Sequence, residues 1–193
     1  LLVNTDDPKD KEEYMAIINR NNELLLQLIS DILDLSKIEA GTLEFIYDMV
    51  DINEMLRGLE MSYRQKNIEH PNIDISFTSH MDKCVIYTEK NRVMQVISNF
   101  LNNALKFTDE GHIHFGYEER ENGLRFFVSD TGKGIPAEKQ DEIFKRFVKL
   151  DSFTNGTGLG LAICQTIVHK LGGEIGVISE ENQGSTFWFT LPV

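Results

Sequence analysis

The chain has 193 residues and a formal net charge of −12, from 31 acidic and 19 basic side chains. Such an acidic protein is a poor partner for nucleic acid, because binding a phosphate backbone requires clustered lysine and arginine. The length allows one domain of about 150 residues with an appendage. No apolar run approaches the roughly 20 residues of a membrane-spanning helix, so any membrane attachment is expected through other parts of an intact protein.

Residues 11–39 are predicted to form one long helix. Its apolar residues recur at alternating steps of three and four, the spacing of a coiled-coil seam. The seam consists of Ile18, Asn21, Leu25, Leu28, Ile32 and Leu35, and Leu24, Ile29 and Leu33 widen it into a broad apolar face. One helix cannot bury this face alone, so the pattern predicts a partner helix or a second chain; the alternative is a core helix of a single globule. Gly41 is expected to end the helix with a left-handed cap.

The rest of the chain alternates between shorter strands and helices. Asp51 and Glu54 have the spacing of a capping box and start a helix over residues 51–68, and Thr88 is expected to cap the next helix. Further helices are predicted over residues 137–147 and 158–171, and strands over residues 42–50, 73–78, 85–88, 112–119, 124–129, 174–179 and 185–191. These elements predict an α+β fold, a two-layer α/β sandwich with helices on one face of a mixed sheet, preceded by the long helix.

Asn99 and Asn103 are four residues apart on a predicted helix, so their side chains point the same way. An amide oxygen is a hard neutral ligand that suits Mg²⁺, which also keeps waters and nucleotide phosphates as ligands. Lys106, about one turn further on, can place an ammonium group near those phosphates. The alternative for an isolated pair of this kind is the solvated face of an amphipathic helix.

A first glycine-containing string, DTGKGI, follows a predicted strand. Asp130 ends that strand, and its carboxylate can accept the amino hydrogen of adenine. Gly132 and Gly134 would leave room for a flat ring, because no Cβ stands in the way. Taken alone, such a string is more often an ordinary turn.

The second glycine-containing string is GTGLGL at residues 156–161. Its glycines, Gly158 and Gly160 among them, precede an apolar helix whose N-terminus favours an anion. The backbone amides of Thr157, Leu159 and Gly160 are therefore candidates for binding a triphosphate. The string matches neither the Walker loop nor the dinucleotide-binding pattern.

The strings NFLNNALKFT, DTGKGI and GTGLGL occur in the order of the N box and the glycine boxes of sensor histidine kinases, and the chain resembles their ATP-binding domain. That domain belongs to the family of gyrase, chaperone, kinase and mismatch-repair ATPases. The resemblance implies that Asn103 binds Mg²⁺ and that Asn99 faces the metal and the phosphates. It also implies that Asp130 selects adenine and that Ile135 lines the base pocket.

Position 99 also bears on the type of reaction. Many hydrolytic relatives have glutamate there, which activates water. The amide of Asn99 has no pKa that would let it act as a base at neutral pH. The sequence therefore favours phosphoryl transfer to a protein over hydrolysis.

Between the glycine strings, IFKRFVKLDSFTN resembles the F box and ATP lid of these kinases. Phe144 and Phe147 have helical spacing and are expected either to pin the lid to the domain or to be core residues. The resemblance implies that Lys149 reaches the terminal phosphate, with Arg146 as the weaker candidate. Near the end of the chain, GSTF resembles the last glycine box, in which the hydroxyl of Thr186 would support the adenine-binding aspartate through water.

The long helix ends in DILDLSKIEAG and resembles the second helix of a dimerisation and phosphotransfer hairpin. The acceptor histidine of such a hairpin stands in an S-H-E-x-[RK]-[TN]-P string, and none of the five histidines has these neighbours. The start at Leu1 rather than at methionine indicates a fragment. Residues 1–41 are therefore interpreted as a partial hairpin without its acceptor, and residues 42–193 as the catalytic ATP-binding domain.

The sequence thus predicts the catalytic part of a two-component sensor histidine kinase. It would transfer the γ-phosphoryl group of ATP to a histidine outside this fragment, for relay to a response-regulator aspartate. Asn99, Asn103 and Lys106 would act in catalysis, with ATP and Mg²⁺ as cofactors. The expected partners are a receiver domain and a second copy of the chain, bound through the N-terminal helix. The short lid is similar to that of hybrid kinases.

Two other functions stay open at this point: a hydrolytic ATPase of the same superfamily, and a non-enzymatic, nucleotide-gated dimerisation module. The cysteines bear on location. Cys84 and Cys164 lack metal-type spacing and are expected to be buried, reduced thiols. Reduced thiols favour a cytoplasmic setting, and the resemblance implies the cytoplasmic portion of a membrane-anchored sensor.

Overall fold

The computed structural model describes residues 8–67, 72–79, 81–148 and 157–193. A five-stranded mixed sheet forms one layer, with the strand order β2-β4-β5-β7-β6. β2 and β4 are parallel, and the other neighbours are antiparallel. The strands of this sheet span Ile73–Thr78 (β2), Gly111–Arg120 (β4), Gly123–Asp130 (β5), Ile175–Glu180 (β6) and Gly184–Pro192 (β7).

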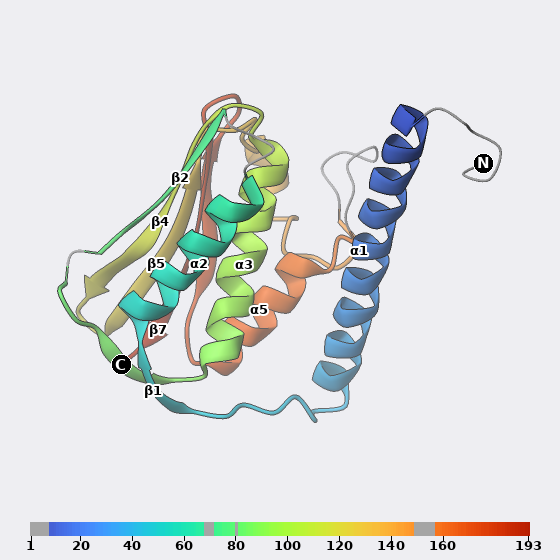
Figure 1. The fold of residues 1–193 in the computed structure, drawn as a ribbon. Helices are drawn as coiled ribbons and strands as arrows, with labels where there is room; N and C mark the ends of the chain where they lie inside the picture. Colours follow the sequence, from blue (N-terminus) through green and yellow to red (C-terminus); the bar gives the residue numbers. More distant parts are fainter. Residues whose placement is uncertain (1–7, 68–71, 80, 149–156) are drawn as a thin grey trace.

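Helices α2, α3 and α5 cover one face of the sheet, and the long helix α1 lies outside this layer, beside α5 (Figure 1). β1 and β3 pair as a separate antiparallel ribbon. The helices and these two strands span Pro8–Glu39 (α1), Asp48–Asp51 (β1), Ile52–Lys66 (α2), Val85–Thr88 (β3), Lys90–Phe107 (α3), Ala137–Gln140 (α4) and Gly160–Lys170 (α5). The predicted α+β sandwich with a preceding long helix is therefore confirmed.

Two further features of the sequence can be compared with the structure. Cys84 and Cys164 are buried free thiols, as predicted. Among the described residues, no helix combines the length and the apolar character required to span a bilayer.

Aromatic side chains make the contact between α3 and the sheet. Phe100 is fully buried, and its ring centroid lies 5.3 Å from that of Phe187 and 6.1 Å from that of Phe189. Phe126 stacks on Phe189 at 4.9 Å, so the aromatic cluster extends across β5 and β7. The buried residues of α3 recur at helical spacing and comprise Val93, Val96, Ile97, Phe100, Leu101 and Ala104. This stripe fixes the rotation of α3 about its axis.

The starts of the helices follow the predictions in part. Asp51 caps α2 by accepting the N–H of Glu54 at 3.1 Å, as the capping-box spacing predicts. The predicted cap of α3 at Thr88 is wrong. Thr88 is the buried last residue of β3, and the carboxylate of Glu89 accepts the N–H of Arg92 instead.

The strand predicted over residues 42–50 is mostly irregular, and only its end pairs, as β1. Its partner β3 has four residues, so the earlier part of the segment has no strand to pair with. Residues 42–47 are instead placed by side-chain contacts, since Phe45 stacks on Tyr47 and Tyr47 stacks on Tyr87.

The helix predicted over residues 137–147 ends at Gln140, and turns follow it. Phe147 adopts a φ of +62°, and its N–H donates to the carbonyl of Gly158 at 2.8 Å. This bond connects the two chain segments that flank residues 149–156 and takes Phe147 out of any helix. Phe147 is 69% exposed, so its predicted role as a pin or a core residue is wrong, whereas Phe144 packs against the core.

The apolar face of α1 is divided between two surroundings. Leu35 packs against the core and Leu28 is half-buried, while Leu25 and Ile32 are exposed. The exposed apolar side chains of α1 comprise Met15, Ile17, Ile18, Leu25, Leu26, Ile29, Ile32 and Leu33. The predicted seam therefore does not form a single exposed stripe, because the domain covers part of it. Gly41 ends the helix at a φ of +69°, which confirms the left-handed cap.

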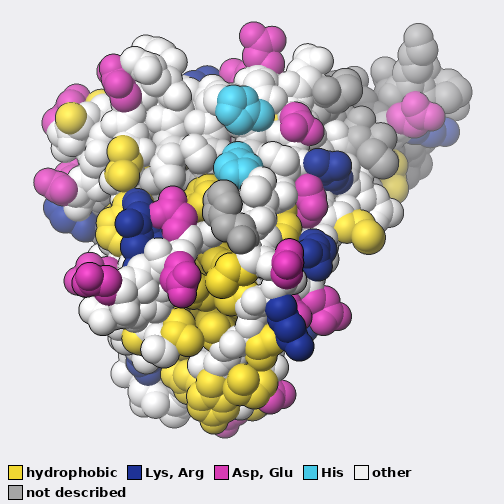
Figure 2. All heavy atoms as spheres, turned by 90° about the vertical axis from the view of Figure 1, so that its left-hand side faces the viewer, with side chains coloured by type: hydrophobic (Ala, Val, Ile, Leu, Met, Phe, Trp, Pro, Cys, Tyr) yellow, Lys and Arg dark blue, Asp and Glu magenta, His cyan; other side chains and the backbone are white. Residues whose placement is uncertain are grey.

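The opposite face of the sheet is left uncovered by the described helices. Figure 2 shows this side of the molecule, where hydrophobic side chains gather at the centre and the lower end. Trp188 is half-buried in β7, and the guanidinium of Arg125 lies 4.8 Å from its ring. The indole covers Gly176, where a Cβ would come within 2.5 Å of it. A larger residue at position 176 would therefore require the indole of Trp188 to move.

Candidate nucleotide-binding site

One cavity of about 260 Å³ is lined by residues of α3, the turn after β5, the start of α5, β7 and α1. Of the predicted site residues, those that line it are Asn99, Asn103, Lys106, Asp130, Gly134, Ile135, Thr157, Gly158 and Gly160. The predicted residues that are not among its lining are Gly132, Leu159 and Thr186. Lys149 lies outside the described residues, and Arg146 pairs with Glu39 of α1 at 2.6 Å. The three motifs predicted from the sequence, on α3, after β5 and before α5, therefore meet at one cavity.

α3 brings an amide pair and a lysine to the cavity. Asn103 Nδ2 donates to Asn99 Oδ1 at 3.3 Å, so the two side chains lie together, as their spacing predicts. This bond engages the amino group of Asn103 and leaves its carbonyl oxygen for a cation. Among the described residues, no group of three or more His, Cys, Asp and Glu side chains could hold a metal. Amide oxygens together with the phosphates of a ligand fit the coordination chemistry of Mg²⁺.

Asp130 ends β5 and is 7% exposed. Its Oδ1 accepts the N–H groups of Gly132 at 2.9 Å and Ser185 at 3.3 Å. Burial raises the pKa of Asp130, and these two backbone hydrogen bonds oppose the rise. Within the described part of the chain, no hydrogen bond reaches Oδ2. This oxygen is therefore available to a donor such as the amino group of adenine.

The turn after Asp130 is held by close backbone contacts. A Cβ on Gly132 would lie 2.3 Å from the carbonyl oxygen of Phe107. One on Gly134, which has a φ of +66°, would lie 1.9 Å from the carbonyl oxygen of Glu180. The packing of the chain on itself therefore requires these glycines, whereas we expected from the sequence that they make room for a ligand. Their consequence for the site is indirect, because they fix the backbone that carries Asp130.

The glycine string before α5 lies against the amide pair. Gly158 has a φ of +71°, which a right-handed helix excludes, and α5 begins at Gly160, two residues later than predicted. A Cβ on Gly160 would lie 2.2 Å from Asn99 Nδ2. The side chain of Leu159 is buried in the core, and its N–H donates to Thr157 Oγ1 at 3.1 Å. The N-terminus of α5, which favours an anion, therefore lies directly beside α3.

β7 presents Ser185, rather than Thr186, to Asp130. The register pairs Asp130 with Ser185 and Ser129 with Thr186, and the hydroxyls of the latter two lie 2.8 Å apart. Ser185 lines the cavity, although sequence reasoning missed it. Strand alternation could have found it, because neighbouring residues of a strand point to opposite faces.

α1 adds three residues to the cavity that sequence reasoning also missed, namely Leu24, Gln27 and Asp31. Asp31 is only 5% exposed. Its carboxylate accepts from Gln27 Nε2 and from Thr157 Oγ1, each at 2.7 Å. A buried carboxylate of the long helix is thus bonded to the glycine string.

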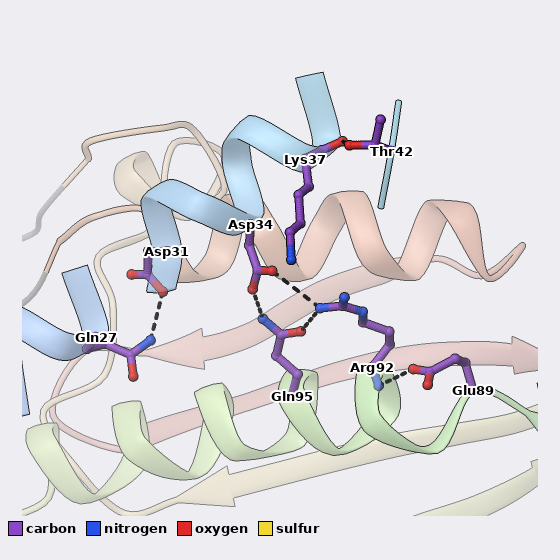
Figure 3. A network of polar contacts seen from close by, with 8 residues as sticks. All are labelled: Gln27, Asp31, Asp34, Lys37, Thr42, Glu89, Arg92 and Gln95. Carbon is purple, nitrogen blue, oxygen red and sulfur yellow. Dashed lines mark hydrogen bonds and ion pairs between the residues drawn. The ribbon is translucent and has the colours of Figure 1, made fainter. Parts of the chain in front are cut away.

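A second polar contact fixes α1 to α3. Asp34 accepts from Gln95 Nε2 at 2.7 Å and pairs with Arg92 at 3.5 Å. Figure 3 shows this network, with Asp31 and Asp34 on adjacent turns of α1. The signal in the sequence is a polar stripe, since Gln27, Asp31 and Asp34 follow steps of four and three.

Comparison with known proteins agrees with this geometry. Residues 88–193 match the family described as "Histidine kinase-, DNA gyrase B-, and HSP90-like ATPase". The chain belongs to this ATPase family. The matched region begins at the end of β3 and contains α3, both glycine strings and four of the five strands of the large sheet.

Proteins similar to this chain are named histidine kinases. Hybrid signal transduction histidine kinase B of Dictyostelium discoideum is 35% identical over 100% of this chain and 10% of its own length. Signal transduction histidine-protein kinase BarA of Escherichia coli (strain K12) is 33% identical over 98% of this chain and 22% of its own length. The chain therefore spans less than a quarter of the length of these relatives.

The fold also matches solved histidine kinases. The crystal structure of full-length ShkA in complex with AMPPNP has a TM-score of 0.82 and 32% identity, over 99% of this chain and 40% of that one. The complex of histidine kinase ThkA with the response regulator protein TrrA has a TM-score of 0.75 and 26% identity, over 97% of this chain and 53% of that one. The similarity includes α1, because both alignments cover nearly the whole chain.

Replacing Asp130 with asparagine should not destabilise the protein at pH 7. Burial raises the pKa of Asp130, so the ionised carboxyl costs the folded state free energy relative to the unfolded state. Asparagine keeps an oxygen for the N–H groups of Gly132 and Ser185 and removes the charge. We expect Asp130→Asn to unfold at the same or a higher temperature than wild type.

The sign of the pH dependence follows from the raised pKa. As pH falls through the folded-state pKa toward the ordinary value of about 3.9, the wild-type carboxyl takes up a proton more readily in the folded state. Any excess of the unfolding temperature of Asp130→Asn over that of wild type should therefore become smaller as pH falls. Thermal unfolding of both proteins between pH 7 and pH 4 measures this. A variant that is clearly less stable than wild type at pH 7 contradicts a net cost of burying this carboxylate.

Proposed function

We propose that the chain binds ATP with Mg²⁺ and transfers the γ-phosphoryl group to a histidine, as the catalytic part of a two-component sensor histidine kinase. The observation that carries this proposal is the meeting of the amide pair, Asp130 and the N-terminus of α5 at one cavity, in a member of this ATPase family. The phosphoryl group would pass from the histidine to a response-regulator aspartate.

Each part of MgATP has a counterpart in the cavity. Asp130 Oδ2 would accept the adenine amino hydrogen, and the amide oxygens of Asn103 and Asn99 would hold the metal. Lys106 would offset phosphate charge from the same helix, and Lys149 is proposed to approach the terminal phosphate. Bound Mg²⁺ would supply charge neutralisation at the phosphate oxygens. Positioning and electrostatic stabilisation of this kind account for most of a phosphoryl transfer.

Transfer to a protein is favoured over hydrolysis by the residue at position 99. Asn99 lines the cavity beside the N-terminus of α5, and an amide cannot take a proton from water at neutral pH. We propose that the acceptor histidine belongs to the first helix of a hairpin outside this chain, with residues 1–41 as the partial hairpin and 42–193 as the catalytic domain. The described histidines lie on β4 and α5, not on α1.

A receiver domain is the proposed partner for the second transfer. Support comes from the solved complex of ThkA with a response regulator and from relatives named hybrid kinases. Other relatives are named sensor kinases, which supports the proposal that this chain is the cytoplasmic portion of a membrane-anchored sensor.

Labelled ATP tests the proposed reaction. The chain alone should stay unlabelled and should label an added hairpin that carries the acceptor histidine. Asn103→Ala should lower that rate at least about 100-fold, because a metal ligand is lost. Asn122→Ala, in the exposed turn between β4 and β5, should not change it. Release of free phosphate without labelled hairpin would favour the hydrolytic ATPase, and ATP binding without either reaction would favour the nucleotide-gated dimerisation module.

We further propose that α1 pairs with a second copy of the chain. Its exposed apolar side chains, Leu25, Ile29 and Ile32 among them, have helical spacing, and burying each is worth about 1.5–3 kcal/mol. Light scattering should give a dimer for wild type and a monomer for a variant with Ile29→Glu and Ile32→Glu. Both should bind ATP equally, since neither residue lines the cavity. A wild-type chain that stays monomeric at high concentration contradicts this pairing.

A further inference from the structure

Asp31 is the acidic residue that α1 contributes to the wall of the cavity. The wall also contains Asn99, Asn103 and Lys106, the residues proposed to act on Mg²⁺ and the phosphates. A carboxylate in this place cannot serve as a phosphate ligand, because both groups are negatively charged. Its presence among phosphate-binding groups therefore needs an explanation beyond the packing of α1.

The hydroxyl of Thr157 links this carboxylate to the glycine string. Thr157 Oγ1 donates its single hydrogen to Asp31 Oδ2 at 2.7 Å and accepts the N–H of Leu159 at 3.1 Å. Thr157 lines the cavity, and its hydroxyl hydrogen is thereby used in a contact that ends on α1. A triphosphate at the glycine string would therefore meet a donor that the carboxylate already engages.

Asp31 and Asp34 differ in how their negative charges are compensated. Asp34 pairs with Arg92, whereas within the described residues Asp31 has hydrogen bonds from Gln27 and Thr157 and no ion pair. The negative charge of Asp31 also acts on a residue of α5. Burial raises the pKa of Cys164 in the first turns of that helix, and the negative charge of Asp31 adds to the rise. An anion thus already lies next to the helix that is proposed to receive the phosphates.

We propose that Asp31 sets the affinity of the site for ATP relative to adenosine. With α1 docked, its carboxylate competes with the triphosphate at the glycine string and weakens the binding of ATP, while the affinity for adenosine is unchanged. This inference rests on the proposed nucleotide function. Binding of the triphosphate and the Asp31–Thr157 contact oppose each other, and linkage requires each to weaken the other to the same extent. The phosphate end of the nucleotide is thereby coupled to the docking of α1 against the domain.

Calorimetry on the whole chain with two ligands tests this inference. Asp31→Asn keeps the shape of the side chain and an oxygen for Thr157 and removes the charge, and its amino group can donate to Gln27 once the Gln27 amide turns over. The variant should bind MgATP at least about fivefold more tightly than wild type, and adenosine within about twofold of wild type. Asp34→Asn is the matched control. It removes a charge one turn away, outside the cavity wall, and should change neither affinity by more than about twofold.

Each other outcome overturns the inference. Unchanged or weaker MgATP binding by Asp31→Asn excludes competition. An equal gain in MgATP affinity for Asp34→Asn would show that the effect comes from general undocking of α1 and not from the charge of Asp31. A wild-type chain that binds neither MgATP nor adenosine refutes the proposed function itself. A chain that binds both MgATP and adenosine but whose affinities are insensitive to Asp31→Asn refutes only this inference.

A second measurement needs no substitution and so does not depend on the folding of a variant. MgATP should accelerate amide hydrogen exchange of wild-type α1 around Asp31, relative to the adenosine complex, because the triphosphate opposes the Asp31–Thr157 contact. Slower or unchanged exchange in the MgATP complex contradicts the competition.

Discussion

The rotation of α3 about its own axis is the constraint on which the site depends. Phe100 packs against Phe187 and Phe189 of the sheet, and the other buried residues of α3 follow the same stripe. With this stripe fixed, Asn99 and Asn103 can project only toward α5 and the end of β5. A rotation of one residue, about 100°, would move the amide pair out of the cavity. The aromatic core therefore matters for function, because it sets the orientation of the side chains that are proposed to bind the metal.

Glycine completes this arrangement at one position in particular. At Gly160 the N-terminus of α5 approaches the side chain of Asn99 so closely that a Cβ would clash at 2.2 Å. The amide pair and the helix N-terminus, one suited to a cation and the other to an anion, thus lie in direct contact. Asp130 stands at the end of β5 with one oxygen held by two backbone N–H groups. Burial of this carboxylate raises its pKa, a cost in stability that the proposed recognition of adenine would explain.

The parts of the structure that follow from local pattern could be predicted from the sequence. The helix that carries Asn99 and Asn103, the cap at Asp51 and the left-handed Gly41 depend on residues close in the chain, and all three were predicted. The order of the motifs was enough to identify the family, because each string contributes residues to the same cavity. The family match and the fold confirm that identification.

The parts that failed depend on contacts between distant segments. Whether residues 42–50 form a strand is decided by the length of β3, which the sequence of the segment does not encode. Phe147 is exposed because its N–H bonds to Gly158, on the other side of residues 149–156, which helical spacing could not reveal. The apolar residues of α1 were interpreted as a coiled-coil seam, and Asp31 was given no role. Asp31 lines the cavity only because α1 lies against the domain, which the local sequence of α1 does not show.

Nuclear magnetic resonance of the isotopically labelled chain during a titration with MgATP tests most directly whether the three segments form one nucleotide site. The side-chain amides of Asn99 and Asn103 and the backbone amides of both glycine strings should shift together and saturate at one stoichiometric ligand. Resonances around the separate groove between β1 and α2 should stay unchanged. Shifts confined to that groove, or separate titrations of the three segments, would contradict a single site built by α3, β5 and α5.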